Sequence, residues 1–116
     1  MQDLKSRTKK FAVDCWRFCA KLPKSRKYDA WSRQLIRCSS SVGANYRASQ
    51  RAKSTADFIN KLKIVEEEVD ESGYWLELFL EVLPEYEPEI IELKKEVSEL
   101  LAITVSSIKT ARKNRK

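Results

Sequence analysis

The sequence contains no histidine, and its 116 residues include only two glycines, three prolines and three cysteines. Without histidine, the usual zinc sites and the Glu-x-x-His di-metal sites of helical bundles lack a ligand. No apolar run approaches the ~18 residues that a membrane span needs, and the polar, basic start is unlike a signal peptide. A glycine-rich phosphate loop and a nucleophile–base pair are also absent. The sequence therefore predicts a soluble, cytoplasmic protein without a cofactor, and it argues against an enzyme.

The cysteines are odd in number, which does not suggest a disulfide framework. Cys15 and Cys19 are four residues apart on an apolar helix face, and Cys38 falls on the apolar stripe of the next helix. With no fourth cysteine and no histidine, a metal site is disfavoured. We predict buried thiols that contribute to packing.

Scarce glycine and proline, together with 34% charged residues interleaved among apolar ones, indicate long helices in a single domain spanning residues 1–116. The predicted fold is an all-α, up-down-up-down four-helix bundle with helices at about 3–22, 29–51, 55–82 and 89–110. Pro23 and Pro84 end the first and third helices, and Asp3 and either Ser54 or Thr55 are predicted N-caps. The basic tail 110–116 is expected to fray into solvent, the alternative being a basic arm.

The second helix carries two stripes with the same heptad-like spacing. One is expected to face the core and consists of Trp31, Leu35, Cys38, Val42, Asn45, Ser49 and Ala52. The other is offset by two residues, about 200° of rotation, and consists of Arg33, Arg37, Ser40, Ala44, Arg47 and Arg51. The arginines are therefore predicted to lie opposite the core.

Small residues occupy the centre of this helix, in the run SSSVGA at positions 39–44. The helix either continues through Gly43 or breaks into two at 39–43. Small side chains let another backbone approach closely, within the bundle or across a subunit interface. Asn45, a polar residue on the predicted seam, is expected to fix the packing register together with Ser41.

Charge is segregated along the chain. Residues 1–53 contain 14 Lys/Arg and 3 Asp/Glu, residues 54–100 contain 4 and 14, and residues 101–116 contain 5 and none. One interpretation is that the basic and acidic halves pair with each other and the remaining charges are solvated. The other is a basic surface that binds a polyanion.

The segment SSSVGANYRASQRAKSTADFINKLKIVEEEVDESGYWLEL resembles the central region of small four-helix-bundle proteins related to those encoded in intervening sequences of bacterial 23S ribosomal RNA genes. The similarity extends from the Lys-Leu-Pro joint at 21–23 to the residues before Leu83. Its most specific parts are Ser41-Val42-Gly43-Ala44-Asn45, Arg47, Asp57-Phe58 and Lys61-Leu62. Many members carry Asn-Ile-Ala-Glu-Gly where this chain has residues 45–49, so a role tied to that glutamate does not carry over.

The resemblance implies an all-α bundle and, from related proteins, a homo-oligomer of five subunits around a central channel. It also implies kinship with the accessory variability determinant of diversity-generating retroelements, a basic bundle that associates with a reverse transcriptase and RNA. The family as a whole has no settled biochemical activity.

Two functional hypotheses follow. The first is a non-enzymatic oligomeric module that binds RNA or another nucleic acid, with candidate binding residues Arg33, Arg37, Arg47, Arg51 and Lys53, and with Tyr28 and Tyr46 as the best candidates for base stacking. The second is a protein–protein scaffold in which the arginines pair with acidic residues of the third helix, such as Glu67, Asp70, Glu71 and Glu77. Whether carboxylates engage the guanidinium groups distinguishes the two.

Overall fold

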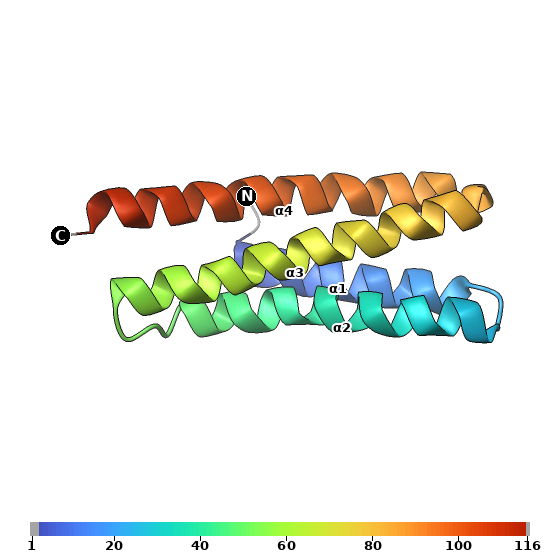
Figure 1. The fold of residues 1–116 in the computed structure, drawn as a ribbon, viewed down its shortest axis with the longest axis horizontal. Coiled ribbons are helices and arrows are strands. Elements are labelled where there is room, and N and C mark those ends of the chain that lie inside the picture. Colours follow the sequence, from blue (N-terminus) through green and yellow to red (C-terminus); the bar gives the residue numbers. More distant parts are fainter. Residues whose placement is uncertain (1–2, 116) are drawn as a thin grey trace.

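The computed structural model describes residues 3–115, in which four α-helices follow one another: α1 (Leu4–Lys21), α2 (Arg26–Ser49), α3 (Thr55–Val82) and α4 (Glu87–Asn114). Each helix runs antiparallel to the next, and together they form an elongated bundle of 51 × 22 × 21 Å (Figure 1). A single 3₁₀ turn, η1 (Pro84–Tyr86), links α3 to α4. The predicted all-α, up-down-up-down four-helix bundle is confirmed.

The helix starts that the sequence predicts for α1 and α3 are confirmed by side-chain caps. Asp3 Oδ1 accepts a hydrogen bond from the Ser6 backbone N–H at 2.7 Å. Ser54 Oγ accepts one from the Asp57 N–H at 3.0 Å, so Ser54 rather than Thr55 is the cap. Each cap satisfies a backbone donor that has no partner within its own helix, which fixes where the helix begins.

The approximate limits predicted for α2 and α4 differ from the observed ones by two to four residues. α2 begins at Arg26 rather than 29 and ends at Ser49 rather than 51. α4 begins at Glu87, with Pro88 in its first turn, where a missing N–H costs nothing. It continues to Asn114 instead of fraying after 110. No glycine or proline interrupts this end of the helix, and Ala111 packs on the core. The positive charges of Arg112 and Lys113 interact favourably with the negative end of the helix dipole.

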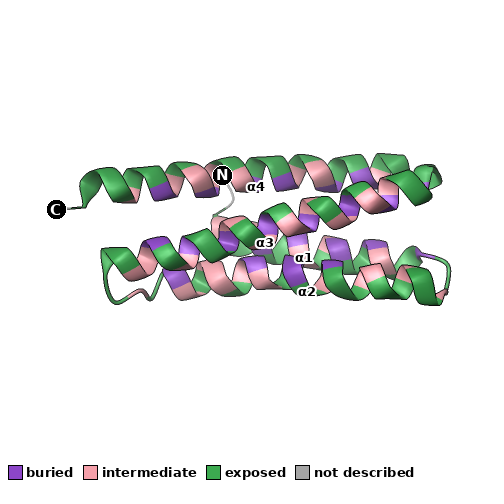
Figure 2. Cartoon of the chain, in the orientation of Figure 1, coloured by how far each residue is buried: buried purple, intermediate pink, exposed green. Residues whose placement is uncertain are grey.

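The core lies along the axis of the bundle and is built from the apolar stripes of all four helices (Figure 2). Phe79, in the last turn of α3, has its ring centroid 5.6 Å from that of Phe18 and 5.6 Å from that of Trp31, both in edge-to-face geometry. Buried hydroxyls bond within their own helices, as when Thr104 Oγ1 donates to the Leu100 carbonyl at 2.7 Å. In residues 3–115, no helix is both long and apolar enough to span a membrane.

α1 is shorter than the helices it packs against. Its 18 residues correspond to about 27 Å, against about 42 Å for the 28-residue α3 and α4. α1 therefore begins partway along the bundle, beside the C-terminal half of α2, where Thr8 meets Gly43 (Figure 1). It packs mainly on α2, and its contact with α4 is less extensive.

Gly43 lies in the contact between α1 and α2, and α2 continues through it without a break. A Cβ added at Gly43 would lie 3.1 Å from Thr8 Oγ1 and 3.6 Å from the Thr8 carbonyl carbon. The first distance is tighter than in most packed contacts, so a methyl group here would push Thr8 back, and its absence lets α1 lie close to α2. The prediction that the second helix continues through Gly43 is confirmed. At Gly43 the small-residue segment packs against α1 of the same bundle.

We expect Gly43→Ala to be more favourable for stability by about 1 kcal/mol in a Thr8→Ala background than in the wild type. Alanine improves helix propensity by up to about 1 kcal/mol, but its methyl group meets Thr8 Oγ1 in the wild type. Urea unfolding followed by circular dichroism measures both changes.

Ala44→Gly is the matched control, because Ala44 is exposed on the same helix. It should destabilise both backgrounds equally, by about 1 kcal/mol. An effect of Gly43→Ala that is the same in both backgrounds would show that Thr8 does not limit the space at this position.

Candidate nucleic-acid interface

The outer face of α2 carries the predicted arginine stripe. Arg33, Arg37 and Arg47 are exposed, as are Ser40 and Ala44 between them. The opposite stripe is buried at Leu35, Cys38, Val42 and Ser49, and half-buried at Trp31, Asn45 and Ala52. The two stripes lie on opposite sides of one continuous helix, as predicted. Arg51 and Lys53, also exposed, lie beyond the helix in its connection to α3.

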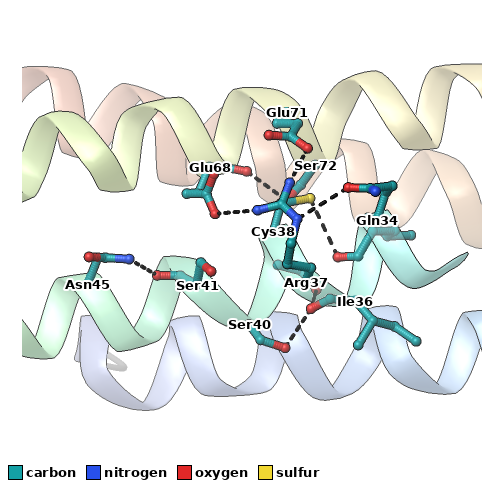
Figure 3. Close-up of polar contacts among 12 residues, drawn as sticks. Gln34, Ile36, Arg37, Cys38, Ser40, Ser41, Asn45, Glu68, Glu71 and Ser72 are labelled. Carbon is teal, nitrogen blue, oxygen red and sulfur yellow. Dashed lines mark hydrogen bonds and ion pairs between the residues drawn. The ribbon is translucent and has the colours of Figure 1, made fainter. Parts of the chain in front are cut away.

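Arg37 is the member of the stripe that carboxylates engage (Figure 3). Its Nη1 lies 3.2 Å from Glu68 Oε2, and its Nη2 donates to Glu71 Oε2. Its Nε donates to Gln34 Oε1 at 3.2 Å. Arg37 therefore joins α2 to α3, and this half of the charge segregation is satisfied within one chain.

Glu71 has a second partner in the same network. The Trp75 indole Nε1–H donates to Glu71 Oε2 at 3.1 Å. The indole hydrogen bond first, and the Arg37 guanidinium second, lower the pKa of the Glu71 carboxyl from its ordinary value. The same pairing raises the pKa of Arg37. These contacts hold α2 and α3 together, so Arg37 is not free to bind a ligand.

The predicted acidic partners divide into three groups. Glu71 pairs with Arg37 as expected, and Glu68, which was not predicted, shares it. Glu77 lies 3.8 Å from Lys94 of α4 instead. Glu67 and Asp70 are exposed and make no ion pair within residues 3–115.

The other four candidate cations are not neutralised in this way. Arg33, Arg47, Arg51 and the Lys53 side chain make no ion pair with any residue that the structure describes. The Lys53 backbone N–H, rather than its ammonium group, donates to Asp57 Oδ2 at 3.0 Å. Within α2, the free arginines from Arg33 to Arg47 extend along the bundle for roughly 21 Å, at 1.5 Å per residue.

Helical phase decides which neighbour each arginine approaches. Arg37 and Arg47 are displaced by about 40° in opposite directions from Arg33. Arg37 turns toward α3, as its ion pairs show. Arg47 follows Asp29 by five whole turns, and Asp29 lines the groove between α1 and α2. Arg47 therefore lies on the α1 side of α2, away from the acidic helix.

Ser41 and Asn45, the predicted register pair, are both half-buried and lie one turn apart on α2 (Figure 3). Asn45 Nδ2 donates to the Ser41 carbonyl at 2.9 Å. This bond lies within α2 and joins no second helix. A role in register stays a prediction.

Sequence reasoning placed the aromatic contribution at Tyr28 and Tyr46, but both rings are half-buried and pack against the core. The more accessible aromatic residue is Trp16 of α1, with 58% of its surface exposed. Its position outside the apolar stripe of α1 was the available signal.

The basic residues of α1 also separate by face. On the α4 side, Arg7 pairs with Glu96 and Glu99, both at 2.7 Å, and Lys21 lies 3.1 Å from Glu89. On the α2 side, Lys5 and Lys9 are exposed and make no ion pair within residues 3–115. Lys5 and Lys9 therefore lie on the same side of the bundle as the free arginines of α2.

The thiols occupy packing positions, as predicted for Cys15 and Cys38, which are buried; Cys19 is half-buried. Burial raises the pKa of all three thiols. Ser72 Oγ lies 3.2 Å from Cys38 Sγ across the α2–α3 contact. Within the described residues, no group of three or more acidic, cysteine or histidine side chains is arranged to hold a metal ion.

Comparison with known proteins gives one consistent result. The family model described as 23S rRNA-intervening sequence protein matches residues 2–106. A crystal structure of a protein of unknown function from the S23 ribosomal protein family of Bacteroides thetaiotaomicron is similar over 92% of this chain and 99% of that chain, with 33% identity and a TM-score of 0.85. No curated protein matches. The chain thus belongs to the family of 23S rRNA-intervening sequence proteins.

Proposed function

We propose that this protein is a non-enzymatic, oligomeric helical-bundle module of the cytoplasm that binds RNA, or another nucleic acid, through the cations on the outer face of α2. The observation that carries the proposal is the state of Arg33, Arg47, Arg51 and Lys53, which are exposed and make no ion pair within residues 3–115. Exposed lysine and arginine side chains without a carboxylate partner bind the phosphate groups of nucleic acids and release the counterions condensed on them.

The interior supports the non-enzymatic part of the proposal. The buried hydroxyls of Thr8 and Thr104 donate to carbonyls of their own helices at 2.7 Å, and Ser72 donates to the Glu68 carbonyl at 2.8 Å. In the described part of the chain, every buried side-chain nitrogen and oxygen has a hydrogen-bond partner. These polar groups are used in structure, so the surface is the better place to look for function.

A scaffold without nucleic acid is the second candidate, and the Arg37–Glu68–Glu71 cluster favours it. Within one chain, Arg37 of α2 pairs with Glu68 of α3, and Arg7 of α1 pairs with Glu96 of α4. The exposed Glu67 and Asp70 are able to accept arginines of a neighbouring subunit in the same way. In this case the free cations of α2 are part of a subunit interface.

The test combines light scattering with RNA binding. By resemblance to related proteins, we expect an assembly of five subunits, about five times the 13.5 kDa of the chain. Fluorescence anisotropy of a labelled single-stranded RNA should show an affinity that falls with salt. With four phosphate contacts, the slope of log K against log salt concentration is about −3.

Binding that is absent at low salt would reject the RNA-binding proposal and favour the scaffold. A single 13.5 kDa species would reject the oligomeric part alone. A salt slope near zero would show that the α2 cations do not contact phosphates, whatever the affinity.

A further inference from the structure

Trp16 lies in a groove between α1 and α2 that the proposed cation surface does not explain. The groove has a volume of about 290 Å³, and Trp16 and Ala20 of α1 face Ser32, Arg33 and Ile36 of α2 across it. The indole is 58% exposed, although its burial would be favourable. An exposed tryptophan beside an unpaired arginine indicates a surface for a ligand that is both aromatic and anionic.

Helical phase places further cations beyond the groove, on the same side of α1 and α2. On α1, Lys5 and Lys9 share the side of Trp16 to within about 20° of helical rotation. The contact between Thr8 and Gly43 places this part of α1 beside the second half of α2, where Arg47 lies. Lys5, Lys9, Arg33 and Arg47 are all exposed, and none makes an ion pair within residues 3–115.

The groove also contains a carboxylate, that of Asp29, at the end where Trp16 lies. Asp29 lines the groove near Trp16, and Ser32 adds a hydroxyl group. Carboxylate and hydroxyl oxygens accept hydrogen bonds from the amino groups on base edges. The groove therefore offers a ring to stack on, acceptors for a base edge, and cations for phosphates, at separate positions along about 16 Å from Lys5 to Trp16.

We infer that this groove binds single-stranded nucleic acid, with an unpaired base stacked on Trp16 and the flanking phosphates on Arg33 and the cations toward Arg47. The inference rests on the proposed function and specifies its ligand. Base stacking on an aromatic side chain tolerates any sequence but requires a base that is free of the duplex. The protein should therefore prefer single strands to duplexes.

A protein ligand is the weaker fit. A protein interface is centred on several closely packed large side chains that exclude water. Here the exposed apolar surface is centred on one ring, beside the half-buried Ile36 and the small residues Ala20 and Ser32. Four unpaired cations along the groove would also remain to be neutralised.

The test compares Trp16→Ala and Trp16→Phe with Tyr74→Ala, a matched control because Tyr74 is 53% exposed on the acidic helix α3. The probes are a labelled oligouridylate of about ten nucleotides and a duplex RNA of equal length. Trp16→Ala should weaken oligouridylate binding by roughly tenfold to a hundredfold and change duplex binding less than about twofold. Trp16→Phe should retain most of the affinity, and Tyr74→Ala all of it.

Ala20→Glu is a second variant, which leaves Trp16 in place and adds a carboxylate to the groove. It should also weaken oligouridylate binding, by about tenfold. Circular dichroism establishes that each variant is folded, and light scattering gives its mass.

Four results would overturn the inference. If Trp16→Ala binds oligouridylate as the wild type does, in a salt-dependent manner, base stacking is rejected while the proposed function stands. If it weakens both probes equally, Trp16 does not read unpaired bases. If it changes the mass of the assembly without changing RNA affinity, a second copy of the chain occupies the groove. A wild-type protein that binds neither probe rejects both proposals.

Discussion

Replacing Arg33, Arg47 and Arg51 with glutamate is expected to weaken RNA binding by about a hundredfold or more at low salt. All three arginines are exposed and make no ion pair in the part of the chain that the structure describes. Their reversal removes three phosphate contacts and adds three repulsive charges. The fold should be retained, because none of these side chains contributes to the core. Anisotropy with a labelled RNA across a salt series measures the effect.

Arg37 is left out of this variant because the structure gives it another role. A glutamate at 37 would face Glu68 and Glu71, so it would place three carboxylates together and destabilise the α2–α3 contact. Sequence spacing alone groups Arg37 with the other three. Including it would combine a loss of stability with a loss of binding.

The matched control reverses Arg17, Lys63 and Lys109, three exposed cations on α1, α3 and α4 without ion pairs in residues 3–115. Both triple variants lower the net charge of +6 by six. A purely nonspecific attraction to RNA would respond to both equally. Equal loss in the two variants would therefore reject the α2 face as the binding surface, and unchanged binding in the first would reject it outright.

Phe79→Ala should lower the free energy of unfolding by about 3–5 kcal/mol. Phe79 is fully buried, and its edge-to-face contacts with Phe18 and Trp31 join α3 to α1 and α2. Alanine would leave a cavity at the point where three helices meet, and the rigid helices on each side limit its collapse. Urea unfolding monitored by circular dichroism measures the change.

Tyr74→Ala is the control for this second variant, since it removes an aromatic residue of the same helix from the surface. It should change stability by less than about 1 kcal/mol. A loss at Phe79 that is no larger than the loss at Tyr74 would show that the core is not organised around the Phe18–Phe79–Trp31 cluster.

Helix identity was predictable because it depends on local features. The stripe of α3, from Leu62 through Val69 and Leu76 to Leu83, is buried throughout, and the caps at Asp3 and Ser54 are where the side-chain chemistry requires them. The limits of α2 and α4 were less predictable. Residues 26–28 and 111–114 are polar or small, and their helical state depends on neighbouring turns and, at Ala111, on packing.

The sequence by itself determined that the arginines of α2 lie opposite its buried stripe, because helical phase is a local property of the chain. Only the tertiary structure decided which neighbour each arginine meets. It turned Arg37 to the carboxylates of α3 and left Arg33 in the groove between α1 and α2. It also left Trp16 exposed in the α1–α2 groove. These outcomes depend on how α1, α2 and α3 are placed around one another. Contacts between residues distant in the sequence determine that placement, and the close packing of Thr8 on Gly43 is one of them.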